Sequence, residues 1–279
     1  MADESETQNI TRAIKRLLDE GSRGVLATLL EMPASASSSL MVGSKLLRLE
    51  TGEVVGGLGD PELDEAVTRQ ARGFLETRDS TKSFRVEEFA PDLVDFRSAL
   101  LLFERIEAEP HLVIAGAGHV GAALARLAGL LGYRVTLIDD RVEFVTRDLF
   151  SARNEQNIEL IEAENWADAL RVAIAKGRGV SVAIVTRGHK EDEECLRAAL
   201  AVKPDYIGMI GSKRRTNIVL ERLREAGADE ERLQMVHAPI GLDLGAVSPE
   251  EVALAILAEI VAERRGGSTA PLSAWRSKK

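Results

Sequence analysis

Residues 111–121 of this chain read HLVIAGAGHVG, a short apolar run that leads into glycines at the spacing G-x-G-x-x-G. A segment rich in alanine and leucine follows from Ala122 to Leu131 and is typical of a helix. A second apolar run, Arg134 to Ile138, then ends at Asp139 and Asp140. This order predicts a strand, a tight turn, a helix and a second strand, as in a dinucleotide-binding unit.

The three glycines of this stretch have different physical roles. Gly116 permits the tight turn, Gly118 lets a phosphate approach the backbone, and Gly121 lets the helix pack on the strand. The helix start at His119 and Val120 would offer unpaired N–H groups and the positive end of the helix dipole, which favour a pyrophosphate. His119 is therefore a candidate ligand contact, although it could instead hydrogen-bond the backbone of its own turn.

The acids after the second strand complete the pattern. Asp139 would accept hydrogen bonds from a ribose, and Asp140 extends the same candidate site. Because both strands, the helix and the acid are in place, we expect a Rossmann-like unit. The sequence leaves open whether its ligand is a dinucleotide or another nucleotide with a phosphate.

The composition narrows the classes of protein. A length of 279 residues suits two domains, and a net charge of −9 argues against binding nucleic acid through a general basic field. Cys195 is the single cysteine, which excludes a disulfide framework and a multi-cysteine metal site, and the four histidines show no metal-ligand spacing. The polar, acidic start has no secretory pattern, and no apolar run is long enough to span a bilayer. We expect a soluble, cytoplasmic protein without a bound metal.

The N-terminal half predicts a smaller α+β domain over residues 9–109. Residues 1–8 are expected to be disordered and residues 107–110 to form a linker. Asp60 and Pro61 predict the start of a helix that reaches about Leu75, because Asp is a favoured N-cap and Pro suits the first helical position. The other expected elements are a helix at 10–18, strands at 24–30, 40–50, 54–57, 83–89 and 99–106, and a loop at 31–39.

From residue 110 to residue 266, strands and helices alternate, which predicts a parallel sheet covered by helices on both faces. Ser248, Pro249 and Glu251 form a capping box that starts the last helix, which ends near Arg265. The other expected elements are strands at 158–161, 180–185, 206–210 and 235–236, and helices at 166–176, 193–201 and 213–224. The predicted fold class is therefore α/β, with a Rossmann-like C-terminal domain after the smaller α+β domain.

Four unusual segments follow predicted strands of this sheet: 116–121, 186–189, 211–215 and 239–245. Ligands of open parallel sheets bind outside the carboxyl ends of the strands. We therefore expect these four segments to share one binding site.

The third segment places cations at a helix start. Gly211 and Ser212 lead into Lys213, Arg214 and Arg215. A cationic helix N-terminus is unfavourable for the helix dipole, so a bound phosphate would resolve a local conflict. The alternative is that these cations are solvated residues on the helix surface.

The other segments contribute further candidates. Arg187 and His189 lie in one loop, and His189 either faces a ligand or is an exposed loop histidine. Asp243 either binds a ligand or stabilises its own turn. Asp192 is expected to cap the helix that follows it, and Cys195 to pack inside that helix.

Together these segments resemble the XdhC/CoxI family. The resemblance rests on residues 114–121 (IAGAGHVG), 139–141 (DDR), 186–189 (TRGH) with Asp192, 206–214 (YIGMIGSKR), and 239–245 (PIGLDLG) followed by 248–251 (SPEE). It implies an accessory protein for molybdenum hydroxylases of the xanthine dehydrogenase type, a chaperone rather than a catalyst.

Such a protein is expected to bind molybdenum cofactor (molybdopterin or its dinucleotide), to protect it during sulfuration and to deliver it to the apo-enzyme. The resemblance implies a homodimer and a cysteine desulfurase as a further partner. The cofactor would contact the turn from Gly116 to Gly121, with the helix start after Gly211 as a second anion contact.

The N-terminal half departs from the family pattern at two places. Residues 31–39 lack the family's Gly-Ser-x-Pro-Arg loop, and residues 56–60 read GGLGD where the family tends to have Gly-Gly-Cys-x-Glu. Leu58 therefore occupies the cysteine position. If that thiol is needed to hold molybdenum or sulfur, this protein binds its cofactor differently or does another job.

Two other functions stay open. The glycine pattern alone would suit an NAD(P)-dependent oxidoreductase, but neither Tyr133 nor Tyr206 is followed four residues later by a lysine. Asp139 would favour NAD over NADP, a preference that Arg141 weakens. The third candidate is a non-enzymatic nucleotide sensor whose N-terminal domain docks a partner.

Overall fold

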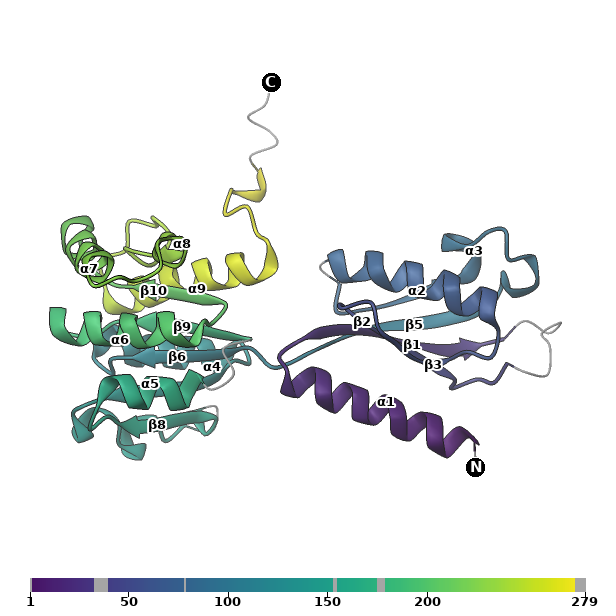
Figure 1. The fold of residues 1–279 in the computed structure, drawn as a ribbon, viewed down its shortest axis with the longest axis horizontal. Helices are drawn as coiled ribbons and strands as arrows, with labels where there is room; N and C mark the ends of the chain where they lie inside the picture. The colour runs from purple at the N-terminus through teal and green to yellow at the C-terminus, as the bar shows by residue number, and fades with distance from the viewer. Residues whose placement is uncertain (1, 33–39, 78, 153–154, 175–178, 274–279) are drawn as a thin grey trace, which may run out of the picture. The chain divides into compact units, whose positions relative to one another are not determined.

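The computed structural model describes residues 2–32, 40–77, 79–152, 155–174 and 179–273. These residues form two compact units, 1–108 and 109–279 (Figure 1). The unit boundary falls directly after the last strand of the first unit, which ends at Glu107. Among the described residues, no helix is long and apolar enough to cross a membrane.

The first unit is built on a five-stranded antiparallel sheet with the order β3-β2-β1-β5-β4. Its elements are α1 (Ala2–Asp19), β1 (Arg23–Glu31), β2 (Lys45–Leu49), β3 (Val54–Gly57), α2 (Pro61–Glu76), β4 (Thr81–Arg85), α3 (Val86–Phe89), a 3-10 turn (Val94–Phe96) and β5 (Leu100–Glu107). Successive side chains of a strand point to opposite faces. Val25, Ala27 and Leu29 of β1 therefore pack with α2, while Leu26 packs with α1.

Most elements expected in this unit are confirmed. The first helix, the second strand and the segment at 83–89 differ. The first helix begins at Ala2, so residues 2–8 are helical where disorder was expected. The second strand begins at Lys45 rather than Leu40, because Gly43 adopts a left-handed conformation (φ 93°) in a turn before it. The expected loop at 31–39 lies largely outside the described residues.

The segment expected as one strand over 83–89 is divided. Strand β4 ends at Arg85, and α3 begins at Val86, which is fully buried. The Glu88 side chain accepts a hydrogen bond from the Arg85 backbone N–H at 2.6 Å. A side chain that satisfies a backbone donor in this way starts a helical turn and ends the strand.

The second unit contains a six-stranded sheet with the order β11-β10-β9-β6-β7-β8, and all of its strand pairs are parallel. Its elements are β6 (His111–Ala115), α4 (His119–Leu130), β7 (Arg134–Asp139), two 3-10 turns (Val142–Phe144 and Arg147–Phe150), β8 (Ile158–Glu162), α5 (Trp166–Ile174), β9 (Val180–Ile184), α6 (His189–Val202), β10 (Tyr206–Met209), α7 (Lys213–Glu225), α8 (Glu230–Gln234), β11 (Val236–His237) and α9 (Pro249–Arg265). The chain runs outward from β6 to β8 and then returns to β9 on the other side. The point between β6 and β9 is therefore the topological switch point, where such sheets bind ligands.

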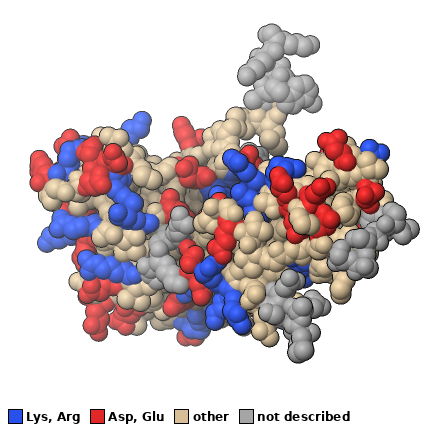
Figure 2. All heavy atoms as spheres, turned by 45° about the vertical axis from the view of Figure 1, so that its right-hand side comes forward, with Lys and Arg blue, Asp and Glu red and all other residues tan. Residues whose placement is uncertain are grey.

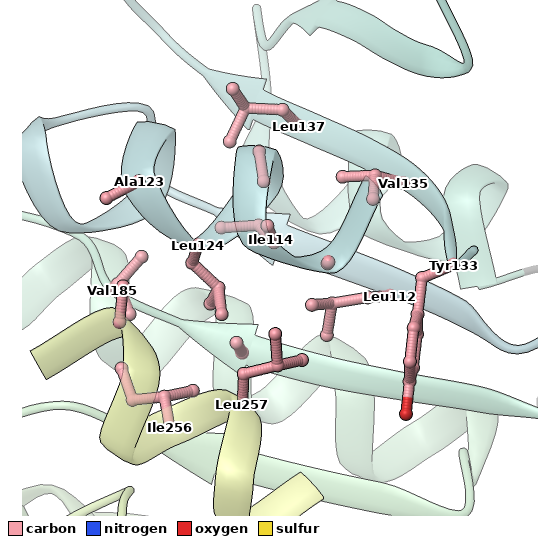
Figure 3. Packing of buried hydrophobic residues seen from close by; sticks show 14 of the residues in the cluster. Leu112, Ile114, Ala123, Leu124, Tyr133, Val135, Leu137, Val185, Ile256 and Leu257 are labelled. Carbon is pink, nitrogen blue, oxygen red and sulfur yellow. The ribbon is translucent and has the colours of Figure 1, made fainter. Parts of the chain in front are cut away.

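Apolar residues on both faces of the strands explain why helices cover this sheet on both sides. Leu112 and Ile114 pack with α4 and α9, whereas Val113 and Ala115 pack with α5, α6 and α7. Figure 3 shows the first of these layers, where Leu124 of α4 and Leu257 of α9 point toward the strands. The expected α/β class with a parallel sheet is confirmed.

Three elements of this unit differ from expectation. Helix α6 begins at His189, one turn before the expected Glu193. Helix α8 was not expected, although Asp229 caps it by accepting a hydrogen bond from the Glu231 N–H at 3.0 Å. The last strand covers Val236 and His237, one residue later than expected.

The surface carries charges of both signs. On the face drawn in Figure 2, acidic and basic side chains are interspersed among the described residues.

The capping box of α9 gives a direct test of local stability. The Ser248 hydroxyl accepts a hydrogen bond from the Glu251 N–H at 3.2 Å, and the Glu251 carboxylate accepts one from the Ser248 N–H at 2.9 Å. We expect Ser248→Ala to lower the free energy of unfolding by about 1 kcal/mol, measured by urea denaturation. Ser248→Thr retains the acceptor and should stay within about 0.5 kcal/mol of the original chain; an equal loss in both variants would exclude the cap as the cause.

Candidate functional site

The glycine turn joins β6 to α4 in a space that excludes larger side chains at two positions. Gly116 has φ 112°, and a Cβ there would lie 2.5 Å from the carbonyl oxygen of Val185. A Cβ at Gly121 would lie 1.8 Å from the carbonyl oxygen of Gly116. Both glycines are therefore required by backbone packing, whether or not a ligand binds.

Gly118 differs from these two glycines because the space beside it is open. It is the N-cap residue of α4, and a Cβ placed on it would meet no atom of the described chain within 4 Å. No side chain of the described residues caps this helix start. The first N–H groups of a helix need partners, so this open position suits a phosphate oxygen.

The next two residues have separate positions. His119 is exposed at the start of α4, where its ring can reach a ligand. The Val120 side chain packs against the hydrophobic core. Only the backbone of Val120 is therefore suited to contact a ligand, which refines its predicted role.

Asp139 does not have the free carboxylate expected of a ribose acceptor. It is 2% exposed, and it accepts hydrogen bonds from the backbone N–H of Ala117 at 2.7 Å and of Arg141 at 3.0 Å. The Arg141 guanidinium donates two more, at 2.8 and 3.0 Å. Burial alone would raise the pKa of Asp139, but the hydrogen bonds from Arg141 and Ala117 outweigh burial and lower it. Asp139 therefore holds the turn in place and has no acceptor position left for a ribose.

Asp140 is the more accessible of the two acids. Its carboxylate pairs with the guanidinium of Arg187 at 2.9 Å, and the two side chains are 30% and 50% exposed. Arg141 lies 3.9 Å from the same carboxylate and stacks over the Phe144 ring at 3.8 Å. The structure therefore brings these two predicted site residues into direct contact, and their role in binding stays a prediction.

Asp192 does not cap α6, contrary to expectation. Gly188 is the N-cap residue, and Asp192 is completely buried within the first turn. Its carboxylate accepts a hydrogen bond from the Thr186 hydroxyl at 2.5 Å and pairs with Arg215. Burial raises the pKa of Asp192, and Thr186 and Arg215 only partly offset this effect.

Asp192 also determines where the Arg215 side chain lies. The sequence had suggested Arg215 as a candidate phosphate contact. Arg215 reaches back from α7 to this buried carboxylate, and its Nε is buried with no hydrogen-bond partner among the described residues. The pair joins the first turn of α6 to the start of α7. Arg215 therefore has an internal structural role.

The remaining cations at the start of α7 stay accessible. Lys213 and Arg214 are exposed, and no ion pair to either is found within the described part of the chain. The Ser212 hydroxyl caps α7 by accepting a hydrogen bond from the Arg215 N–H at 3.2 Å, and Gly211 precedes it with φ 150°. Lys213 and Arg214 are thus the two cations of this segment that can meet an anion.

The last two expected residues lie at the start of α6 and in the loop after β11. His189 is exposed at the first position of α6. Asp243 is exposed, and its carboxylate has no hydrogen-bond partner among the described residues. The described residues therefore show no hydrogen bond by which Asp243 would stabilise its turn, and its binding role stays a prediction.

A small pocket lies at the carboxyl ends of β6, β7 and β9. Its volume is about 80 Å³, and its lining consists of Gly116, Gly118, Asp139, Asp140, Arg141, Trp166, Val185, Thr186 and Arg187. Typical ligand pockets have roughly 300–1,000 Å³. The pocket therefore fits a part of a nucleotide, such as a ribose or a phosphate. Trp166 is a lining residue that the sequence did not indicate, because no motif surrounds it.

A second polar cluster was also missed. The Glu259 carboxylate on α9 accepts hydrogen bonds from the Tyr206 hydroxyl at 2.5 Å and from the Gly241 N–H at 3.0 Å. It also pairs with His237 Nδ1 at 3.0 Å, and the His237 ring lies 4.5 Å from that of Tyr206. This cluster anchors the 239–245 loop to α9. Its members are far apart in sequence, so no local signal reveals it.

The single cysteine is not available for chemistry. Cys195 is fully buried in α6, and burial raises the pKa of its thiol. Leu58, which the sequence resemblance places at the family's cysteine position, is also fully buried and packs in the core of the first unit. No group of three or more His, Cys, Asp or Glu residues suited to a metal ion is present in the described ranges.

Two family models match this chain: the XdhC Rossmann domain over residues 112–260, and the XdhC and CoxI family over residues 17–89. The chain belongs to the XdhC and CoxI family. The Rossmann match contains every candidate residue of the site described above. The second match contains Leu58 at the cysteine position.

Three curated relatives show similarity to parts of this family member. Uncharacterized protein YqeB of Escherichia coli is 29% identical over 232 residues, 81% of this chain and 41% of YqeB. A probable xanthine dehydrogenase subunit of Bacillus subtilis is 27% identical over 165 residues, 59% of this chain and 46% of that protein. The molybdenum cofactor insertion chaperone PaoD of E. coli is 36% identical over 69 residues, 25% of this chain and 22% of PaoD. The chain thus spans less than half the length of each relative.

One solved structure shares the fold over nearly the whole chain. A xanthine dehydrogenase from Bacillus halodurans aligns with a TM-score of 0.50 and 18% sequence identity. The alignment covers 94% of this chain and 98% of that chain. At this level of identity the likeness shows a common fold.

The contrast between Gly121 and Gly118 can be tested by two alanine substitutions. Gly121→Ala places a Cβ against backbone, and overpacking of this kind costs about 1–3 kcal/mol. Gly118→Ala enters open space at φ −63° and should change the free energy of unfolding by less than about 0.5 kcal/mol. Chemical denaturation measures both. Equal losses would contradict the assigned geometry.

The Glu259 cluster predicts a pH-dependent contribution to stability. The hydrogen bond to Glu259 raises the pKa of His237, with burial opposing and Glu263 assisting. A raised folded-state pKa stabilises the fold fully below the unfolded value of about 6.5, and the contribution disappears as pH rises through the folded value. We expect the stability difference between the original chain and His237→Gln to shrink by up to about 1 kcal/mol from about pH 6 to pH 9, measured by urea denaturation. A difference that is constant with pH would contradict the ion pair.

Proposed function

We propose that this chain is an accessory protein that binds molybdenum cofactor at the switch point of its Rossmann sheet, for delivery to a molybdenum hydroxylase of the xanthine dehydrogenase type. The observation that carries the proposal is the open, uncapped helix start at Gly118 beside the pocket that Asp140 and Arg187 line. Membership of the XdhC and CoxI family and the similarity to PaoD, a molybdenum cofactor insertion chaperone, support the choice of ligand.

The phosphate end of the cofactor fits the residues of this site. The N–H groups at the start of α4 and the space beside Gly118 suit a phosphate oxygen. Lys213 and Arg214 at the start of α7 provide positive charge at the same edge of the sheet.

The chain offers no accessible thiol as a ligand for the molybdenum end of the cofactor. The single cysteine, Cys195, is buried in α6, and Leu58, which replaces the family's cysteine, belongs to a closed apolar core. This difference concerns the metal end of the cofactor and leaves the phosphate end unaffected. The residues of the site therefore bind the anionic, nucleotide-like part of the cofactor. When bound, the cofactor itself supplies the metal chemistry that the client enzyme uses.

The residues of the site hold and orient a ligand without breaking any of its bonds. Helix α4 and the turn fix the phosphate, and Trp166 and Val185 exclude water from the inner wall of the pocket. A dehydrogenase would need a side chain that donates a proton, and Tyr206 would be a candidate. Its hydroxyl donates a hydrogen bond to Glu259 instead. This arrangement suits a carrier.

Delivery after sulfuration, a homodimeric state and a cysteine desulfurase partner are the finer parts of the proposal. Since the described chain presents no exposed thiol, it has no group on which to carry sulfur. A desulfurase would therefore have to act on the cofactor while the chain holds it. Size-exclusion chromatography with light scattering tests the dimer.

The test of the proposed ligand is a thermal-shift comparison of molybdenum cofactor, NAD, NADP, CTP and ATP. A ligand that binds only the folded state adds about 2.7 kcal/mol to stability at one hundred times its dissociation constant. We expect molybdenum cofactor to raise the midpoint and Gly118→Val to abolish the shift, because the valine fills the open position. Gly73→Val, at another glycine with open surroundings on α2, controls for an added side chain and should retain the shift.

Two results of this comparison would overturn the proposed ligand or its proposed site. A shift with NAD or NADP, and none with molybdenum cofactor, would leave an oxidoreductase or a nucleotide sensor. A shift with molybdenum cofactor that persists in Gly118→Val would move the binding site away from the glycine turn.

A further inference from the structure

An ion pair lies across the mouth of the proposed site. In the sheet order, β6 lies between β7 and β9. Asp140 directly follows β7, Arg187 lies in the loop after β9, and their side chains meet at 2.9 Å. This pair, the Asp140–Arg187 bridge, therefore spans the end of the central strand, where the glycine turn begins. Both residues also line the pocket that contains Gly116 and Gly118.

Two ion pairs lie next to each other here, Asp139–Arg141 and Asp140–Arg187. A ligand can displace only the second. Asp139 is buried and fully occupied by Ala117 and Arg141, so a ligand cannot displace its partners without opening the turn. Asp140 and Arg187 are 30% and 50% exposed. Exposed ion pairs are screened by water and contribute little to stability, so a ligand can replace this one readily.

We propose that the ligand opens the Asp140–Arg187 bridge by exchange. A phosphate at the helix start takes the Arg187 guanidinium, and the released Asp140 carboxylate accepts a hydroxyl of the attached ribose. This inference rests on the proposed function, because it uses the same anion site. It assigns to Asp140 the ribose role that Asp139 cannot fill.

The exchange makes the site selective for a nucleoside diphosphate group over a free phosphate anion. Inorganic pyrophosphate can take Arg187, but it leaves the Asp140 carboxylate with only the longer contact to Arg141, at 3.9 Å, and close to the negative charge of the pyrophosphate. A ribose attached to the phosphate brings hydroxyl donors to the same carboxylate. Hydrogen bonds to charged groups are the stronger ones, so the ribose compensates for the broken bridge.

Isothermal titration calorimetry on the 279-residue chain tests the exchange with three probes: CDP, 2′,3′-dideoxy-CDP and inorganic pyrophosphate. For the original chain we expect CDP to bind at least about tenfold more tightly than dideoxy-CDP. Asp140→Asn should reduce this ratio to below about twofold, and it should tighten pyrophosphate binding by roughly tenfold because Arg187 is released. Arg187→Gln should weaken all three probes.

The matched control is Glu143→Gln, which removes the same charge from an exposed residue three positions away. It leaves the bridge intact and should change neither the CDP ratio nor pyrophosphate affinity by more than about twofold. If Asp140→Asn and Glu143→Gln behave alike, the bridge does not compete with ligands and the inference is overturned.

The outcomes separate this inference from the proposed function. If the probes respond as expected but molybdenum cofactor gives no thermal shift, the bridge is supported and the cofactor assignment fails. If neither the original chain nor Asp140→Asn binds any probe while both unfold cooperatively, the anion site is absent, and this overturns both.

Discussion

The carboxylate of Asp139 holds together the part of the second unit on which the site depends. It connects the glycine turn, through Ala117, to the end of the neighbouring strand, through Arg141. A buried carboxylate requires such partners, because an unpaired charge in the interior is very costly. Once Asp139 is satisfied in this way, Gly116 and Gly118 are held in position before any ligand arrives, so binding does not have to order them.

Asp192 and Arg215 repeat the same arrangement on the other side of the switch point. In both places a buried carboxylate is neutralised by one arginine and by a short hydrogen bond or backbone amide. The charged residues around the switch point therefore fall into two groups. Those that shape the loops are internal, and those that remain exposed, such as Asp140, Arg187 and Lys213, are available to a ligand.

Local patterns in the sequence were sufficient for most of the elements and for the glycine turn. The G-x-G-x-x-G spacing, the alternation of strands and helices and the capping box at Ser248 all act between residues close in the chain, so they could be read directly. The positions of α3 and of the start of α6 were missed because a buried valine and a glycine N-cap, respectively, decide them. Of the four segments predicted to share one site, 116–121 and 186–189 line the same pocket, whereas 211–215 and 239–245 do not line it.

Only the tertiary structure decided what each charged residue does there. Asp139 and Asp140 are adjacent and chemically identical, yet one is buried under Arg141 and the other is exposed beside Arg187. The same applies to Arg215, which reaches Asp192, and to Lys213, which stays exposed. Burial and partner choice depend on residues distant in the chain, and the free energy of a charge depends on both, so no local pattern could separate them.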